Sequence, residues 1–421
     1  MSKKPNVLII PAISPLHGKR KILATLFELE NLLKKEVNLI LEKVVHDLTQ
    51  VSHLKIDEEK FDAIIVFVGS GGTSNIVKKL VMNKNWILLA YGGNNSLPSA
   101  LTVKEKLTME GKWRGHLFYV DTKKMEQNLK GIVRTIHVLR ETKNLKFATI
   151  GFIGDDEKLD KKDFIRRFFG ISVKTLSLKE LKSRFNRITD EEVNSLISKF
   201  KGCFEVVEPS QKDIKNSLKL YLTLKSIIKT KNLSCITLDC FSLLKKLNVT
   251  PCLAFSLLID ENLQGICEGD LLHAPLILLL SRLTEKPCWL ANLSKINLEE
   301  NTLTFAHCTA ATKLSDTGKV KLRSHFESGL SVALDVQLKK GPVTIIHVVE
   351  EPPSLVVGVG EIVKTRLQEE SLCRTQVNLK FNGNLEKFLE ITGNHHILCY
   401  EDLTSELKIV SKAVGIKLVK V

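Results

Sequence analysis

The stretch FDAIIVFVGSGGTSNIVKKLVMNKNWILLAYGGNNS, residues 61–96, decides the fold class of this chain. It holds two apolar runs, 61–68 and 86–91, whose length and composition are typical of buried strands, and each run ends in a glycine-rich turn. A helical segment at 75–82 lies between them. The alternation of strand, turn and helix predicts a doubly wound, mostly parallel sheet of the α/β class.

The first of these turns, GSGGTS at 69–74, has two interpretations. It lacks the Lys-Ser/Thr ending of a phosphate-binding P-loop, and it does not follow the GxGxxG pattern of dinucleotide-binding folds. Its glycines can simply permit a tight turn before the helix. Alternatively, its backbone N–H groups form a polar rim that faces a sugar or a phosphate.

Changes in the sequence pattern along the chain predict three domains. A polar ETKN segment at 141–144 ends the first α/β region, and a second one begins with the apolar run KFATIGFI at 146–153. After about residue 320, short alternating strands separated by Gly and Pro predominate, which is typical of a β-barrel. We therefore predict two Rossmann-like α/β domains, 1–143 and 144–320, followed by a C-terminal β-barrel domain, 321–421.

The composition is that of a well-buried and strongly basic chain. Its 421 residues are 43% hydrophobic, and 62 Lys and Arg against 47 Asp and Glu leave a formal charge of +15. This charge suits nucleic acid or an anionic membrane, but the lysines are dispersed and no nucleic-acid-binding motif accompanies them. We therefore interpret the excess as a lysine-rich solvated surface, and we expect neither a nucleic-acid nor a membrane partner.

The cysteines and the apolar runs bear on the compartment. All nine cysteines follow residue 200, and none belongs to a CxxC pair. No apolar run approaches the length of a membrane span, and the first residues lack the apolar core of a signal peptide. Scattered cysteines in a chain of this kind indicate reduced thiols and a cytoplasmic location.

The candidate site begins in GICEGDLLHAPLILLLSRLTEKPCWLANLSKINLEENTLTFAHC, residues 265–308. Glu268 lies in a glycine-rich turn, Asn292 follows WLA, and His307 ends the alternating run TLTFAH. If WLAN and TLTFAH are strands of the second α/β sheet, their ends share the rim where such folds bind ligands, and the three side chains converge there. The structural alternatives are a capping Glu, a turn Asn and a core His.

Further candidates lie elsewhere in the chain. Asp239 ends the strand-like CITLD and is either a supporting carboxylate or a turn and cap residue. His395 and His396 are adjacent in an apolar strand. Because neighbouring residues of a strand point to opposite faces, only one of these histidines can face a site.

Five motifs, in order along the chain, resemble the L-fucose isomerase family and, more distantly, L-arabinose isomerase. They are GGTS with GGNNSLPSA, CEGDL, ANLSKINLEENTLTFAHC, HFESGLSVALDVQLKKGPVTI, and GNHHILCYED. The resemblance implies two Rossmann-like domains and a barrel, with the site between the second and third domains. It also implies a divalent cation, usually manganese, an aldose–ketose interconversion of a monosaccharide, and a homo-oligomer, trimer or hexamer, in which a neighbour's first domain reaches the site.

Carried over residue by residue, the resemblance implies a metal site. Glu268 in CEGDL matches the family's metal-binding catalytic glutamate, and Asn292 falls where the fucose enzymes have an aspartate. His307 resembles a histidine ligand of the arabinose enzymes, and His396 matches the late metal-binding histidine. We therefore expect these four residues to bind the cation, with Mn²⁺ as the expected metal.

The resemblance also implies the remaining roles. Glu268 or the nearby Asp270 is expected to move the proton between C1 and C2 of an open-chain sugar, through an enediolate. The expected sugar contacts are Asn95, Asp239, His395 and His325.

The amide at position 292 leaves an alternative open. It can coordinate a cation, but it carries no charge and accepts no proton at neutral pH. The alternative hypothesis is therefore a catalytically altered sugar-binding or regulatory protein on the isomerase scaffold. A nucleic-acid binder is the third hypothesis, and only the net charge suggests it.

Overall fold

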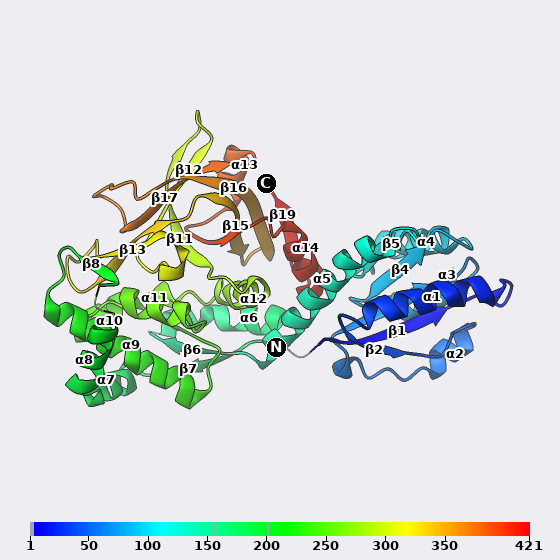
Figure 1. The fold of residues 1–421 in the computed structure, drawn as a ribbon, viewed down its shortest axis with the longest axis horizontal. Coiled ribbons are helices and arrows are strands. Elements are labelled where there is room, and N and C mark those ends of the chain that lie inside the picture. Colours follow the sequence, from blue (N-terminus) through cyan, green and yellow to red (C-terminus); the bar gives the residue numbers. More distant parts are fainter. Residues whose placement is uncertain (1–3, 155, 201) are drawn as a thin grey trace. The chain divides into compact units, whose positions relative to one another are not determined.

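A computed structural model describes residues 4–154, 156–200 and 202–421 (Figure 1). The chain forms two compact units. The amino-terminal unit comprises Met1–Lys143 and Glu406–Gly415, and the carboxy-terminal unit comprises Asn144–Ser405 and Ile416–Val421. Within the described residues, no helix combines the length and the apolar character that crossing a bilayer requires.

The amino-terminal unit is built on a five-stranded parallel sheet with the order β2-β1-β3-β4-β5. Its central strand β3 is buried along its whole length, which is typical of a parallel sheet covered on both faces. Helices α1 and α5 pack on one face, and α3 and α4 pack on the other. The strands are β1 (Asn6–Ala12), β2 (Asn38–Leu41), β3 (Ala63–Val68), β4 (Ile87–Tyr91) and β5 (His116–Val120).

The helices of this unit include one from the end of the chain. Ile409 and Ala413 of α14 pack against the same core layer as α1 and α5. Arg134 of α5 forms an ion pair with the buried Glu406 of α14. The helices are α1 (Lys19–Leu33), α2 (Leu48–His53), α3 (Ser74–Val81), α4 (Ser96–Met109), α5 (Met125–Asn144) and α14 (Thr404–Val414).

The GSGGTS turn after β3 is closed by its own hydrogen bonds. The Thr73 hydroxyl donates to the Ser70 carbonyl at 2.7 Å, and the Gly71 N–H donates to the Asn94 carbonyl at 2.7 Å. Gly72 has a φ of +75°, which glycine adopts at little cost. These contacts favour the interpretation of the glycines as a tight turn.

The carboxy-terminal unit contains a second parallel sheet, with the order β10-β9-β6-β7. Its strands are β6 (Thr149–Ile153), β7 (Ser172–Thr175), β9 (Cys235–Leu238) and β10 (Gln264–Ile266). Its helices are α6 (Lys162–Phe169), α7 (Leu178–Arg187), α8 (Asp190–Lys199), α9 (Gln211–Lys231), α10 (Cys240–Leu247), α11 (Cys252–Asp260) and α12 (Ala274–Thr284).

The same unit contains a closed barrel of six antiparallel strands, with the order β15-β18-β11-β12-β17-β16. Pairing of β16 with β15 closes the barrel and leaves these strands without a free edge. The strands are β11 (Trp289–Asn297), β12 (Thr302–His307), β15 (Gly341–Val349), β16 (Ser354–Thr365), β17 (Thr375–Phe381) and β18 (His395–Tyr400). The predicted fold class, parallel α/β sheets with a C-terminal barrel, is confirmed.

Smaller elements complete the carboxy-terminal unit. Strand β19 (Lys417–Lys420) extends the barrel by pairing in parallel with β16, and α13 (Leu385–Ile391) precedes β18. A three-stranded sheet has the order β14-β13-β8, with β8 (Phe204–Val206), β13 (Ser315–Arg323) and β14 (Ala333–Leu338). One continuous apolar core contains Phe255 of α11 together with Phe305 and Phe381 of the barrel. The α/β sheet and the barrel are therefore packed together.

The placement of WLAN and TLTFAH corrects one expectation. Both were expected in the second α/β sheet, but they lie in β11 and β12, which pair antiparallel with each other and belong to the barrel. The reason is the short connection 298–301, because consecutive strands joined by a short turn form an antiparallel hairpin and a parallel pair needs a long crossover. The predicted three-domain boundaries remain a proposal.

Candidate active site

Glu268 lies at the carboxyl end of β10, in the short turn Cys267–Gly269. Its φ is +59°, a left-handed conformation that costs a residue with a Cβ about 1–2 kcal/mol. The Glu268 N–H donates to the sulfur of Cys240 at 3.4 Å. Strained residues occur at active sites as well as in ordinary turns, and the polar groups around Glu268 make it a candidate functional residue.

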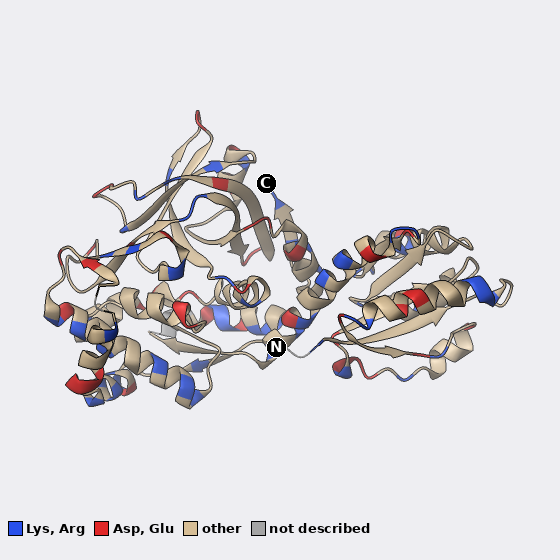
Figure 2. Cartoon of the chain, viewed as in Figure 1, with Lys and Arg blue, Asp and Glu red and all other residues tan. Residues whose placement is uncertain are grey.

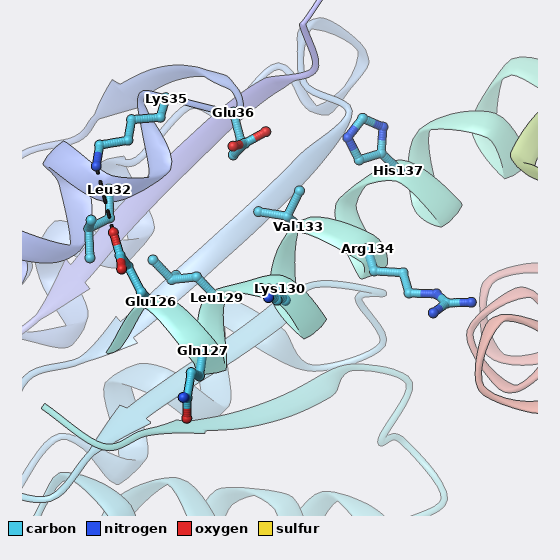
Figure 3. Close-up of a pocket in the computed structure, with 10 residues that line it drawn as sticks. All are labelled: Leu32, Lys35, Glu36, Glu126, Gln127, Leu129, Lys130, Val133, Arg134 and His137. Atoms are coloured by element: carbon cyan, nitrogen blue, oxygen red, sulfur yellow. Dashed lines mark ion pairs between the residues drawn. The ribbon is translucent and has the colours of Figure 1, made fainter. Parts of the chain in front are cut away.

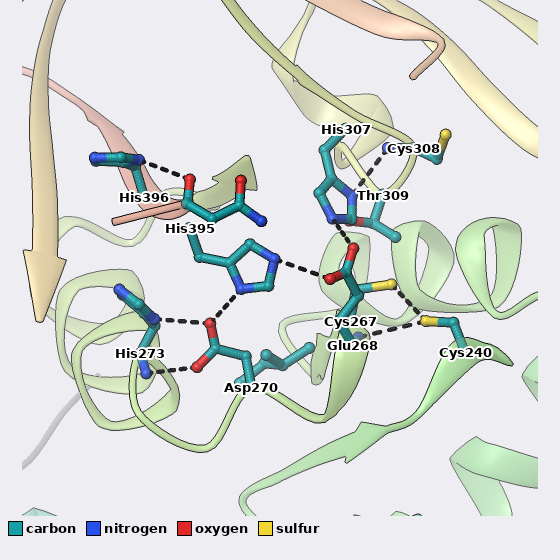
Figure 4. A network of polar contacts seen from close by, with 12 residues as sticks. Cys240, Cys267, Glu268, Asp270, His273, His307, Cys308, Thr309, His395 and His396 are labelled. Carbon is teal, nitrogen blue, oxygen red and sulfur yellow. Dashed lines mark hydrogen bonds and ion pairs between the residues drawn. The ribbon is translucent and has the colours of Figure 1, made fainter. Parts of the chain in front are cut away.

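Two barrel histidines face the Glu268 carboxylate (Figure 4). His307 is the last residue of β12, and its Nε2 lies 3.4 Å from Glu268 Oε1. His395 is the first residue of β18, and its Nε2 lies 3.1 Å from Glu268 Oε2. The potential ligand atoms of these three residues all lie within 4.8 Å of one another, so the group can hold a metal ion.

A second carboxylate lies on the other side of His395. Asp270 Oδ2 lies 2.8 Å from His395 Nδ1 and 2.7 Å from His273 Nδ1. The His273 N–H donates to Asp270 Oδ1 at 3.0 Å. His395 therefore lies between two carboxylates, with one ring nitrogen toward each (Figure 4).

These contacts shift the pKa values of the charged groups. Burial alone would raise the pKa of Glu268, but His307 and His395 hold it well below its ordinary value. Burial likewise opposes the ionisation of Asp270, and His273 and His395 outweigh it and lower its pKa. For His395, burial favours the neutral ring, but Asp270 and Glu268 raise the pKa to about 10. Both carboxylates are therefore ionised at neutral pH.

Two buried polar atoms in this region lack hydrogen-bond partners within the described chain. They are Nε2 of His307 and Oδ1 of Asn292. Asn292 lies directly opposite His395 in the β11–β18 pair, so the two side chains are on the same face. Buried polar atoms are nearly always satisfied, and a cation bound to both atoms would satisfy them. These residues therefore fit a divalent cation.

An open pocket of about 390 Å³ adjoins the two carboxylates. Glu268, Asp270 and His395 line it together with the apolar Leu271 and Leu272. Lys161 also lines the pocket, and its Nζ is 2.8 Å from Asp160 and 2.5 Å from Glu350. Ligand pockets in proteins commonly have volumes of about 300–1,000 Å³, and this one has the size for a single small molecule.

The structure corrects the assignment of His396. This residue was predicted as a ligand, but its side chain is completely buried, and its ring lies 5.3 Å from Phe305 and 5.4 Å from Phe388. The Thr392 hydroxyl lies 2.5 Å from its Nε2. Because alternate residues of β18 point to opposite faces, His395 reaches the carboxylates and His396 points into the apolar core.

Three other predicted sugar contacts, His325, Asp239 and Asn95, are not among the residues grouped around Glu268. His325 Nδ1 lies 3.0 Å from the Ser328 hydroxyl, a local contact within one loop. Asp239 precedes α10 and accepts a hydrogen bond from the Ser242 hydroxyl at 2.6 Å. Asn95 lies at the start of α4 in the amino-terminal unit, with a left-handed φ of +56°.

One residue of this group was missed in the sequence analysis. His273 is 3% exposed and contacts Asp270, and it follows that residue by three positions in the printed sequence. This i, i+3 spacing, directly after the CEGD segment, was the signal available.

A second pocket, of about 540 Å³, lies in the amino-terminal unit between α1 and α5 (Figure 3). Its lining combines Leu32, Leu129 and Val133 with charged side chains, and it includes none of the predicted site residues. In Figure 2, Lys and Arg occur along helices and loops of both units, interspersed with Asp and Glu.

A parallel α/β sheet joined to a closed barrel, with a carboxylate and two histidines grouped between them, defines a candidate metalloenzyme. Residues 159–286 match the L-arabinose isomerase central domain. The chain is similar to a sulfoquinovose isomerase of Alkalicoccus urumqiensis, with 21% identity over 317 residues that cover 72% of this chain and 70% of that protein.

A sulfoquinovose isomerase of Clostridium sp. (strain MSTE9) is 23% identical over 206 residues, which cover 45% of this chain and 44% of that protein. The matches support an enzyme of the sugar isomerase superfamily. They do not single out the L-fucose isomerases, so the predicted resemblance holds at the level of the superfamily.

Proposed function

We propose that this protein is a metal-dependent isomerase that interconverts an aldose and a ketose through an enediolate. The observation that carries the proposal is the grouping of Glu268, His307 and His395, whose ligand atoms lie within 4.8 Å of one another. The relatives named above, all sugar isomerases, support the reaction class.

The cation would be held by the Glu268 carboxylate and by Nε2 of His307 and His395, with Oδ1 of Asn292 as a fourth donor. Mixed oxygen and nitrogen ligation suits manganese, which we propose as the metal. In this structure Nδ1 of His307 accepts from the Cys308 N–H at 2.9 Å, so binding of the cation to Nε2 would require this contact to give way to an Nδ1–H donated to the Thr309 hydroxyl, which lies 3.1 Å away. When bound, the cation supplies Lewis acidity to the sugar carbonyl and the adjacent hydroxyl.

Glu268 is the group that we propose to move the proton. Its low pKa means that it is ionised at neutral pH, and it would accept the proton from C2 of an open-chain aldose and return it to C1, while the proton on O2 passes to O1. A positioned general base of this kind contributes a factor of about 10²–10⁴. The left-handed turn presents this carboxylate at the pocket, so its position is set by the backbone.

The pocket walls would orient the sugar. Leu272 offers an apolar surface for the C–H face of the sugar. Lys161, with Asp160 and Glu350, offers a donor and acceptors for its hydroxyls. A monosaccharide is therefore the proposed substrate, and a homo-oligomer, trimer or hexamer, is the proposed assembly, which light scattering of the purified protein tests.

The test is a Mn²⁺ titration of the metal-stripped protein, followed by assays on L-fucose, L-arabinose and sulfoquinovose. Wild type is expected to bind Mn²⁺ and to isomerise at least one of the three sugars. Glu268→Gln is expected to lose both properties. Glu261→Gln, which removes a carboxylate paired with Lys225, is the matched control and is expected to keep both. If Glu268→Gln kept both, the proposed function would be wrong.

A second candidate function rests on Asn292. Its amide cannot take the acid–base role that a carboxylate could have at this position. A sugar-binding or regulatory protein on the same scaffold would bind Mn²⁺ and a sugar but turn over none of the panel. Sugar binding measured by calorimetry, without any ketose formed, favours this candidate over the isomerase.

A further inference from the structure

Asp270 is buried beneath His395 and is surrounded by hydrogen-bond donors. Its side chain is 7% exposed. Oδ2 is within 2.8 Å of Nδ1 of both His395 and His273, and Oδ1 accepts from the His273 N–H. The carboxylate thus has three donors from two histidines.

The neighbouring contacts determine where the protons of these rings lie. Nε2 of His273 accepts from the Val348 N–H at 3.3 Å, so the neutral ring carries its proton on Nδ1 and donates it to Asp270. The carbonyl oxygen of His395 can only accept, and it lies 2.8 Å from Nδ1 of His347. His347 therefore also carries its proton on Nδ1.

His395 is consequently held at two points. Asp270 accepts the Nδ1 proton of its side chain, and His347 donates to its backbone carbonyl. With Nδ1 engaged, only Nε2 of His395 remains free to bind a cation, and it is the atom that faces Glu268. Figure 4 shows His395 between Asp270 and Glu268 in this orientation.

From this geometry we infer that Asp270 is a positioning residue, which holds His395 in the Nδ1–H tautomer and aims its Nε2 at the metal, and is not a proton carrier of the reaction. The inference rests on the proposed function, because it needs a cation at Glu268, His307 and His395. Metal-binding histidines usually donate their second ring proton to a carboxylate, and loss of that carboxylate weakens metal binding about 10–100-fold. A proton carrier would instead have to release one of its donors at every turnover.

The experiment uses Asp270→Asn, which keeps the shape of the side chain but replaces one acceptor oxygen by a donor. The matched control is Asp260→Asn, a partly buried carboxylate of the same unit, which accepts from the Thr312 hydroxyl at 2.6 Å and from the Lys313 N–H at 3.0 Å. Mn²⁺ affinity is measured from the electron paramagnetic resonance signal of the free ion. Activity is measured as kcat at saturating Mn²⁺ and sugar, and circular dichroism checks folding.

A positioning role predicts that Asp270→Asn weakens Mn²⁺ binding by about 10–100-fold, while Asp260→Asn leaves it unchanged. Saturating Mn²⁺ should then restore kcat to within a hundredfold of wild type, because removal of a general base costs about 10²–10⁴. Unchanged Mn²⁺ affinity, or a larger loss of kcat that saturating Mn²⁺ does not restore, overturns the inference.

Three outcomes separate this inference from the proposed function. Two Mn²⁺ per wild-type chain, one of them lost in Asp270→Asn, would make Asp270 a ligand and would also overturn the positioning role. If the wild-type protein bound no Mn²⁺, the metal dependence in the proposed function would be wrong. Wild-type binding and turnover with an unaffected Asp270→Asn leave the function intact and remove only the inference.

Discussion

When His395 and His396 are replaced one at a time by asparagine, only the His395 variant is expected to lose metal affinity. Asparagine places an amide nitrogen near the position of Nδ1 of the imidazole. His395→Asn can therefore keep the contact with Asp270, and His396→Asn can keep the contact with the Asn394 carbonyl at 3.0 Å. Each variant loses only the Nε2 side of its ring.

The magnitudes follow from the two environments. His395 Nε2 is one of three potential ligand atoms in the group, and loss of a mere supporting partner costs about 10–100-fold in metal affinity. His395→Asn is therefore expected to weaken Mn²⁺ binding at least about a hundredfold, or ~2.7 kcal/mol. His396 is fully buried, and its truncation leaves a small cavity that costs about 1–3 kcal/mol of unfolding free energy.

The assay is the Mn²⁺ affinity of both variants at one pH, together with their unfolding by urea. His396→Asn is expected to keep the wild-type affinity within about threefold while unfolding at lower urea, since threefold is only ~0.6 kcal/mol. Equal losses of affinity would refute the assignment of the two faces of β18. A loss in His396→Asn alone would restore the sequence-based assignment.

Three further outcomes are expected. Asn292→Asp adds a negative charge beside the cation and should tighten Mn²⁺ binding by about tenfold in calorimetry. Opposite charges at ~4 Å attract by several kcal/mol, and desolvation of the carboxylate offsets only part of this. Weaker Mn²⁺ binding would contradict the placement of this side chain. The free energy of unfolding, measured with urea, should be about 1 kcal/mol higher for Glu268→Gly than for Glu268→Ala, because glycine tolerates the positive φ at this position. Burial and the nearby Lys412 and Lys408 lower the pKa of His116 in the folded protein to about 4. The neutral ring therefore stabilises the fold above its ordinary pKa of about 6.5, and this contribution to the unfolding free energy is lost as the pH falls toward 4. Urea unfolding should therefore show about 2 kcal/mol lost between pH 7.5 and pH 5, and His116→Asn should reduce this loss.

Periodicity was sufficient for the fold class but not for every element. Residues 61–96 show the strand, turn and helix order because β3 and β4 are fully buried and therefore continuously apolar. Strand β2 has no such signal, since its four residues are mostly exposed and only their pairing with β1 makes them a strand. A local pattern carries no information about such a partner.

The candidate site shows the same limit. Glu268 was accessible to sequence reasoning because its motif places a carboxylate in a glycine-rich turn. The alternation of β18 showed that one of its two histidines would face a site, but the choice depends on the register that sets His395 opposite Asn292. The support from His273 was visible in the sequence only as an i, i+3 spacing after Asp270, and that spacing does not show how the chain turns after Glu268.

The placement of α14 has a consequence for biosynthesis. Residues 406–415 belong to the amino-terminal unit, although more than 260 residues of the other unit separate them from residue 143. During translation, the first 143 residues leave the ribosome without the helix whose Ile409 and Ala413 cover their core. That apolar patch stays open until residues 144–415 have also been made, and final assembly of the first unit therefore follows synthesis of most of the other unit.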